Sequence, residues 1–247
     1  MDMIGKPARS SDMKYFTWLV LLAQVFGLTA VVLVAVWMGH FQQGFAWQSN
    51  PGLEFNYHPL FMVIGMIFLY SDAILAYRVF RNDKKMYIKL LHAGMQITAL
   101  IFVAVGLKAV FDSHNLKKPD PIPNLYTLHS WLGLITVILF GLQWVGGFAT
   151  FLFPKAGMAT RIMALPHHQF WGIAILCFAA ATACMGITEK CIFSIKDYSQ
   201  RPTQAYVANF LGLMIVCLVT TVIYIVTRPE YKRPPAPEED HVPLEEN

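Results

Sequence analysis

Four histidines of this 247-residue chain occupy similar places, each at the polar edge where a long apolar stretch begins. They are His58, His92, His129 and His168. Neutral imidazole is the commonest protein ligand for metals. Successive membrane helices run in opposite directions, so we expect His58 and His129 to lie at one end of a helical bundle. The other two histidines then lie at the opposite end, and the spacing predicts two metal centres with two histidines each.

The ligand set favours haem over a small metal site. A tetrahedral zinc site needs further Cys, His or carboxylate ligands beside each pair, and the sequence supplies no such cluster. The chain has no Cys-x-x-Cys-His motif, so a haem would be of the b type and held without covalent bonds. Two axial histidines leave no position for oxygen, which favours electron transfer. Ligands at opposite ends of a helix are about 30 Å apart and cannot share one iron, so two haems are required.

The elements that carry these residues are expected to be membrane helices, because 56% of the residues are hydrophobic and only 14% are charged. Six apolar stretches are long enough to cross a bilayer: residues 16–38, 59–80, 91–111, 128–151, 168–188 and 206–227. The first is too long for a signal-peptide core and is interpreted as a retained helix. We therefore predict an all-α membrane protein whose helices two to five form a central haem-binding bundle.

The remaining parts of the chain are short. We divide it into an N-terminal segment (1–15), a six-helix membrane domain (16–227) and a largely disordered tail (228–247). The sequence has no dense run of basic residues of the kind that binds nucleic acid. Four glycines lie near the histidines in the sequence: Gly65, Gly94, Gly133 and Gly172. Their lack of a side chain either makes room for a flat porphyrin or permits close packing of the helices.

Basic residues predict the orientation, because they are retained preferentially in the cytoplasm. Most of them lie in the terminal segments and in the loops around residues 81–90 and 152–167. Both termini are therefore expected to be cytoplasmic. His92 and His168 would then face the cytoplasm, and His58 and His129 the lumen or the outside. The membrane of a secretory vesicle, an endolysosome or the cell surface would all fit this topology.

Several short motifs resemble those of the cytochrome b561 family, from about Phe55 to Pro234. The motifs are Phe55-Asn56-Tyr57-His58-Pro59, Lys89-Leu90-Leu91-His92, Asp112-Ser113-His114-Asn115, Tyr126-Thr127-Leu128-His129-Ser130-Trp131, Pro166-His167-His168 and Thr227-Arg228-Pro229-Glu230-Tyr231-Lys232-Arg233-Pro234. The resemblance implies six helices, two b haems, a homodimer and one-electron transfer from cytoplasmic ascorbate. It also matches His168, and not His167, to the family's ligand.

The resemblance further implies binding residues at each face. Lys89 and Arg161, helped by Lys85, match the family's cytoplasmic ascorbate site, although orientation alone also places basic residues there. Arg78 and Lys232 are expected to pair with haem propionates. His114 and Asn115 resemble the site of the outer electron acceptor. The residues expected to flank the outer haem are Asn124, Leu125, Tyr126, Thr127 and Glu189.

The predicted function is a transmembrane ascorbate-dependent oxidoreductase that reduces monodehydroascorbate on the luminal or extracellular side. The alternative function is that of a ferric-chelate reductase, in which the electron acceptor is a ferric chelate and the product is ferrous iron. A non-redox six-helix transporter or scaffold is a rival from another class, although the sequence lacks broken helices with paired charges. Asp72, inside the second apolar stretch, is a functional candidate of open role. Gln96 and Gln143 are its candidate partners.

Overall fold

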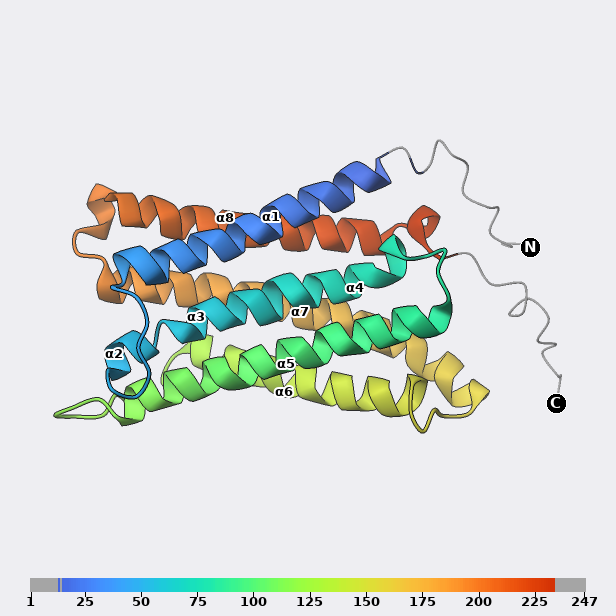
Figure 1. Cartoon of the computed structure of the whole chain (residues 1–247), viewed down its shortest axis with the longest axis horizontal. Helices are drawn as coiled ribbons and strands as arrows, with labels where there is room; N and C mark the ends of the chain where they lie inside the picture. The colour runs from blue at the N-terminus through green and yellow to red at the C-terminus, as the bar shows by residue number, and fades with distance from the viewer. Residues whose placement is uncertain (1–12, 14, 234–247) are drawn as a thin grey trace.

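The structure is a computed structural model that describes residue 13 and residues 15–233, and these residues form a bundle of long helices (Figure 1). Six helical segments are long and apolar enough to cross a membrane: Phe16–Phe41, Pro51–Val79, Lys85–Asn115, Leu128–Phe151, Met158–Ser194 and Thr203–Thr227. The prediction of an all-α protein with six spans is confirmed. The predicted N-terminal segment, apart from residues 13 and 15, and the tail from residue 234 lie outside the described residues.

The first two spans change helix type along their length. The helices are α1 (Phe16–Val36), continued by a π-helix (Trp37–Phe41), α2 (Pro51–Glu54), α3 (Tyr57–Met62), a second π-helix (Val63–Leu69), α4 (Tyr70–Val79), α5 (Lys85–Asn115), α6 (Leu128–Phe151), α7 (Met158–Ser194) and α8 (Thr203–Thr227). Two short 3₁₀ turns follow α7 and α8, at Tyr198–Gln200 and Pro229–Tyr231.

Antiparallel neighbours form most of the packing. α1 packs on α8, α6 packs on α7, and α3 and α4 pack on α5, while α8 also contacts α7 and α4. The beginning of α1 and the end of α8 lie at one end of the bundle, called here the terminal end, and the opposite end is called the distal end (Figure 1). The loops 80–84 and 152–157 lie at the terminal end. The loops 42–50, 116–127 and 195–202 lie at the distal end.

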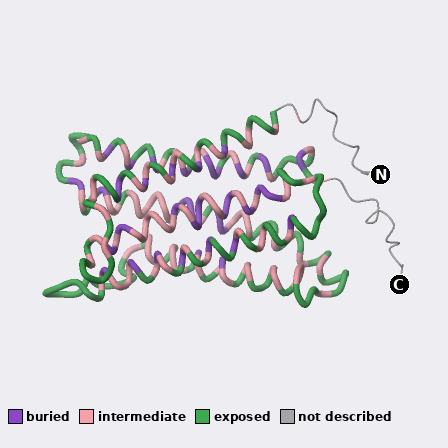
Figure 2. The backbone as a smooth tube through the Cα atoms, viewed as in Figure 1, coloured by how far each residue is buried: buried purple, intermediate pink, exposed green. Residues whose placement is uncertain are grey.

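Burial follows the inner faces of the helices, and much of the outer surface is exposed (Figure 2). On α6 a stripe of large apolar side chains at helical spacing is exposed, formed by Trp131, Ile135, Ile138, Leu142 and Val145. A helix that is hydrophobic all round is typical of a membrane span, where lipid covers the outer face. The chain is therefore an integral multi-pass membrane protein.

Two of the four histidines lie well inside their helices. His58 and His129 are the second residues of α3 and α6, as predicted, but α5 begins at Lys85 and α7 at Met158. The prediction that His92 and His168 open their helices is therefore wrong. They lie about 10 Å and 15 Å along α5 and α7 from the first residue.

The additional turns at the beginnings of α5 and α7 carry basic residues, which explains why the spans predicted from hydropathy begin too late. Lys85, Lys89 and Arg161 lie on these turns. Long basic side chains can lie along apolar surface while their charges reach polar surroundings, so the helix continues past the apolar window. Pro166 also lies inside α7 without ending it.

Local hydrogen bonds fix the places where the two distal histidines begin their helices. Thr127 caps α6, because its Oγ1 accepts a hydrogen bond from the Ser130 N–H (3.3 Å) and its own N–H donates to Ser130 Oγ (3.2 Å). The buried Asn56 donates through Nδ2 to the carbonyls of Gln42 (2.9 Å) and Gly44 (2.6 Å). These bonds join the loop 42–50 to the residues just before α3.

An aromatic pair occupies the middle of the bundle. The Tyr70 ring meets the Phe140 ring edge-on, with centroids 5.0 Å apart, and both side chains are almost fully buried. The Tyr70 hydroxyl donates to the Gly172 carbonyl on α7 (3.0 Å). The pair thus joins α4, α6 and α7 between the two ends of the bundle.

Asp72 has a partner that the sequence did not indicate. Gln24 of α1 donates through Nε2 to Asp72 Oδ1 at 2.6 Å. Neither of the two candidate partners fills this place, since Gln143 donates to the His168 carbonyl and the buried Oε1 of Gln96 has no hydrogen-bond partner among the described residues. The contact connects the α1 and α4 spans, and the sequence could not align two helices so far apart in the chain.

A double-mutant cycle tests this contact. Gln24→Leu alone is expected to lower the free energy of unfolding by about 1 to 3 kcal/mol, because the Asp72 carboxyl loses its partner. Adding Asp72→Leu is expected to recover most of that loss. Thermal unfolding of the detergent-solubilised protein measures both. Simple addition of the two single losses would contradict a direct coupling between the side chains.

Candidate functional site

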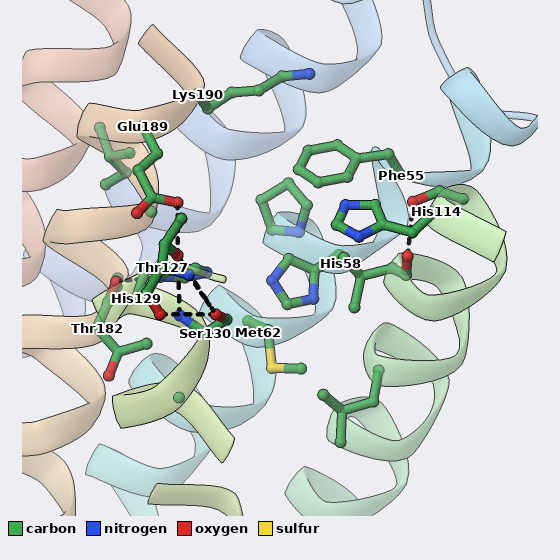
Figure 3. Close-up of a pocket in the computed structure, with 18 of the residues that line it drawn as sticks. Phe55, His58, Met62, His114, Thr127, His129, Ser130, Thr182, Glu189 and Lys190 are labelled. Atoms are coloured by element: carbon green, nitrogen blue, oxygen red, sulfur yellow. Dashed lines mark hydrogen bonds between the residues drawn. The ribbon is translucent and has the colours of Figure 1, made fainter. Parts of the chain in front are cut away.

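The structure brings His58 and His129 together at the distal end. Their ring centroids are 6.2 Å apart and their planes are nearly perpendicular, at 89° (Figure 3). Two imidazoles bound on opposite sides of one metal place their ring centres about 6 Å apart, given a metal–nitrogen bond of about 2 Å. The separation of this distal pair therefore fits a shared metal.

His92 and His168 form a second pair at the terminal end. Their ring centroids are also 6.2 Å apart, with an interplanar angle of 70°. The ring of Tyr77 packs against His92, and the ring of Phe151 packs against His168. His167 is exposed on α7. The geometry of this terminal pair repeats that of the distal pair.

Backbone carbonyls orient three of the four rings. Nδ1 of His58 lies 3.2 Å from the Gly106 carbonyl, and Nδ1 of His129 lies 2.9 Å from the Thr182 carbonyl. Nδ1 of His92 lies 2.7 Å from the Ala73 carbonyl. A carbonyl can only accept, so each Nδ1 carries the proton and donates. Nε2 then keeps a free lone pair, as a metal-binding imidazole requires.

Two glycines make room for one imidazole of each pair. A Cβ atom on Gly186 of α7 would lie 2.5 Å from His129 Cε1, and a Cβ atom on Gly147 of α6 would lie 2.8 Å from His168 Cε1. Each helix of this antiparallel pair thus supplies one histidine and one glycine. Eighteen residues separate histidine and glycine on both helices. Only glycine fits at either position without moving the ring.

A cavity of about 410 Å³ surrounds the distal pair. This volume lies in the range of about 300 to 1,000 Å³ that is usual for cofactor sites. Most of its lining is apolar, including Phe55, Met62 and Met66. The polar side chains among its lining residues include Asn124. Figure 3 labels five others, namely His114, Thr127, Ser130, Glu189 and Lys190.

The structure gathers the predicted outer-site residues at this cavity. Five of them line it beside the distal pair, namely Asn124, Leu125, Tyr126, Thr127 and Glu189, and so does His114. Asn124 connects the predicted acceptor residues, since its Oδ1 lies 3.1 Å from His114 Nδ1 and its Nδ2 donates to Asn115 Oδ1 (2.8 Å). Glu189 Oε2 accepts from Thr127 Oγ1 (3.3 Å).

The predicted terminal-end residues are more dispersed. Lys89 donates through Nζ to the Phe151 carbonyl at the end of α6 (2.9 Å). Arg78 donates to the Val226 carbonyl near the end of α8. The Arg161 side chain contacts Met158 Sδ, and its buried Nε has no hydrogen-bond partner among the described residues. Lys85 and Lys232 are exposed.

The sequence analysis did not identify the glycines that leave space for the histidine rings. Gly147 and Gly186 were not selected, whereas Gly65 packs close to the Ala99 carbonyl of α5 and Gly94 faces no atom within 4 Å. The equal spacing of histidine and glycine on α6 and α7 was a signal that could have found them.

The fold and the site define a class of protein. It is a multi-pass helical membrane protein in which facing helices bring paired histidine side chains together at both ends of a bundle. The donor set fits a b-type haem, because each pair offers imidazoles at the right separation and a glycine leaves space beside one ring of each pair.

Comparison with known proteins agrees with this class. Residues 57–194 match the family model of eukaryotic cytochrome b561. The chain is 42% identical to the transmembrane ascorbate-dependent reductase CYB561 of Homo sapiens over 227 residues, 92% of this chain and 88% of that one. It is 39% identical to the protein of the same name from Bos taurus over 247 residues, 99% of this chain and 95% of that one.

A relative with a different name has the same percentage identity. The plasma membrane ascorbate-dependent reductase CYBRD1 of Xenopus laevis is 42% identical over 225 residues, 90% of this chain and 78% of that one. The chain belongs to the eukaryotic cytochrome b561 family. The resemblance inferred from the sequence motifs is therefore confirmed, and the family implies a b-type haem.

Proposed function

We propose that this protein is an oxidoreductase that carries single electrons across a membrane, from ascorbate at the terminal end to an acceptor at the distal end. The observation that supports this proposal most is the presence of two histidine pairs with the same ring separation at opposite ends of one bundle. The relatives named above are ascorbate-dependent transmembrane reductases. In this proposal each pair holds one b haem, within the central bundle of the second to fifth spans.

A b haem held by the two histidines of a pair would supply a one-electron iron couple. The chain contributes orientation and shielding. Carbonyls of Gly106, Thr182 and Ala73 hold three of the rings by their Nδ1 protons. Apolar side chains such as Phe55 and Met62 line the cavity around the distal pair and lower the polarity of its surroundings.

Ascorbate is oxidised at the terminal end in the proposed reaction. The monoanion gives up one electron and one proton and becomes monodehydroascorbate. Lys85, Lys89 and Arg161 are proposed to bind it, because fixed positive charge stabilises an anion beside the terminal pair. Arg161 supports this role by its buried Nε, which has no partner among the described residues.

The distal end delivers the electron to an acceptor. Monodehydroascorbate would take up one electron and one proton there and become ascorbate, and a ferric chelate would become ferrous. His114 and Asn115 are proposed to contact the acceptor, since Asn124 links both beside the distal pair.

The remaining assignments concern haem contacts and orientation. Arg78 and Lys232 are proposed to pair with propionates, and an arginine keeps several N–H donors when one binds a carbonyl. Asn124, Leu125, Tyr126, Thr127 and Glu189 are proposed to flank the distal haem. The terminal end is proposed to be cytoplasmic in a secretory-vesicle, endolysosomal or plasma membrane, and the protein to be a homodimer.

Purified protein in liposomes loaded with ascorbate tests the proposed function. Only molecules with the terminal end inward turn over, so the measurement selects one orientation. We expect external monodehydroascorbate to be reduced faster than ferric citrate, and the reduced spectrum to show about two haems per protein. Faster reduction of ferric citrate would identify the alternative acceptor. No b-type absorption, or no reduction of either acceptor, would refute the proposal.

A further inference from the structure

Lys190 is a cation of the distal cavity to which the reaction above gives no role. It lies near the end of α7, lines the cavity and is half-buried. Its Nζ lies 4.4 Å from the centroid of the Phe55 ring. The Phe55 ring lies 6.0 Å from the ring of His58, and Figure 3 shows Phe55 between Lys190 and His58. The Phe55 ring thus separates the ammonium group of Lys190 from the distal pair.

The charge of Lys190 is not neutralised within the described part of the chain. No carboxylate there forms an ion pair with it. Glu189, its neighbour in sequence, instead accepts a hydrogen bond from Thr127. Lys117 also lines the cavity, so two ammonium groups and one carboxylate surround this space. A half-buried ammonium group without a counterion favours an anionic ligand.

We infer that Lys190 binds the electron acceptor and selects for acceptors that carry negative charge, such as an enolate or a carboxylate chelate. This inference rests on the proposed function and names the chemical class of its acceptor. The Phe55 ring holds the ammonium group by a cation–π contact and keeps it off the His58 ring. The acceptor binds on the outer side of Phe55, gains one electron there, and the electron comes from ascorbate oxidised at the terminal end.

Two small oxidants of opposite charge test the inference in ascorbate-loaded liposomes. Ferricyanide is anionic, hexaammineruthenium(III) is cationic, and each takes up one electron. Lys190→Met is expected to raise the KM for ferricyanide about tenfold, equivalent to about 1.4 kcal/mol, because the cation that attracts it is lost. The KM for hexaammineruthenium(III) is expected to stay the same or fall. Lys190→Arg is expected to behave like the wild type with both oxidants.

A binding measurement separates this role from turnover. Hexacyanocobaltate(III) has the shape and charge of ferricyanide but is not reduced, and calorimetry on the solubilised protein measures its affinity. Lys190→Met is expected to weaken its binding about tenfold. Lys196→Met is the matched control, because Lys196 is exposed at the same end of the bundle and does not line the cavity.

Three results would overturn the inference. One is an unchanged KM for ferricyanide in Lys190→Met. Another is an equal loss with both oxidants together with a shifted potential of the distal centre, which would place Lys190 on a haem propionate. The third is an equal effect of Lys196→Met, which would mean that surface charge alone attracts ferricyanide. A wild type that reduces neither oxidant would refute the proposed function, and the calorimetry would still decide the role of Lys190.

Discussion

His168→Leu is expected to remove the haem of the terminal end and to leave that of the distal end in place. The haem content should fall from about two to about one per protein, because leucine offers no lone pair to the iron. Rapid reduction by ascorbate should disappear with it. Pyridine haemochrome analysis and stopped-flow absorption measure the two effects.

The residue next to it in sequence provides the control. His167 is exposed on α7, whereas the His168 ring contacts Phe151 and faces His92. His167→Leu should keep both haems and the rapid phase. Loss of a haem in His167→Leu, with full haem content in His168→Leu, would show that His167 and not His168 is the ligand. Loss of both haems in His168→Leu would argue against two independent centres.

Gly147→Ala is expected to weaken haem binding at the terminal end without touching a ligand. The added Cβ would lie 2.8 Å from His168 Cε1, so the ring must move away from its place opposite His92. Overpacking of this kind costs about 1 to 3 kcal/mol. That cost corresponds to roughly a 5- to 150-fold loss of haem affinity at the terminal end. Haem titration of the apoprotein measures it.

Gly146 is the matched control for this substitution. It precedes Gly147 on α6, and a Cβ atom there would meet no atom within 4 Å. Gly146→Ala should leave haem binding unchanged and stabilise the helix by up to about 1 kcal/mol. Equal haem affinity of the Gly147→Ala and Gly146→Ala variants would show that the His168 ring has room to shift.

The sequence predicted the spans and the pairing of the histidines because both depend on simple regularities. Apolar length gives the number of helices, and alternation of direction brings the first and third histidines to one end. The ring separations of both pairs agree with that pairing. Helix ends at the membrane surface were less predictable. Lys85, Lys89 and Arg161 lower the local hydropathy, yet they belong to the helices.

Contacts between distant helices could not be predicted from one sequence. The hydrogen bond from Gln24 to Asp72 depends on the rotation of α1 against α4, which neither helix alone determines. Lys190 became a candidate only when the fold placed it on Phe55 beside the distal pair. Gly147 and Gly186 lie eighteen residues from the histidines of their own helices, so only the packing of α6 on α7 reveals their use.

The π-helical segment Val63–Leu69 has a consequence for how the second and third spans fit together. The bonds His58–Gly106 and His92–Ala73 act as two rungs of a ladder between these antiparallel helices. Fifteen residues separate the rungs from His58 to Ala73, but fourteen separate them from His92 to Gly106. A π turn holds more residues than an α turn over the same rise. The π-helical segment thus accommodates the one additional residue of the second span. Both hydrogen bonds can therefore form, although the two helical segments between them differ in length by one residue.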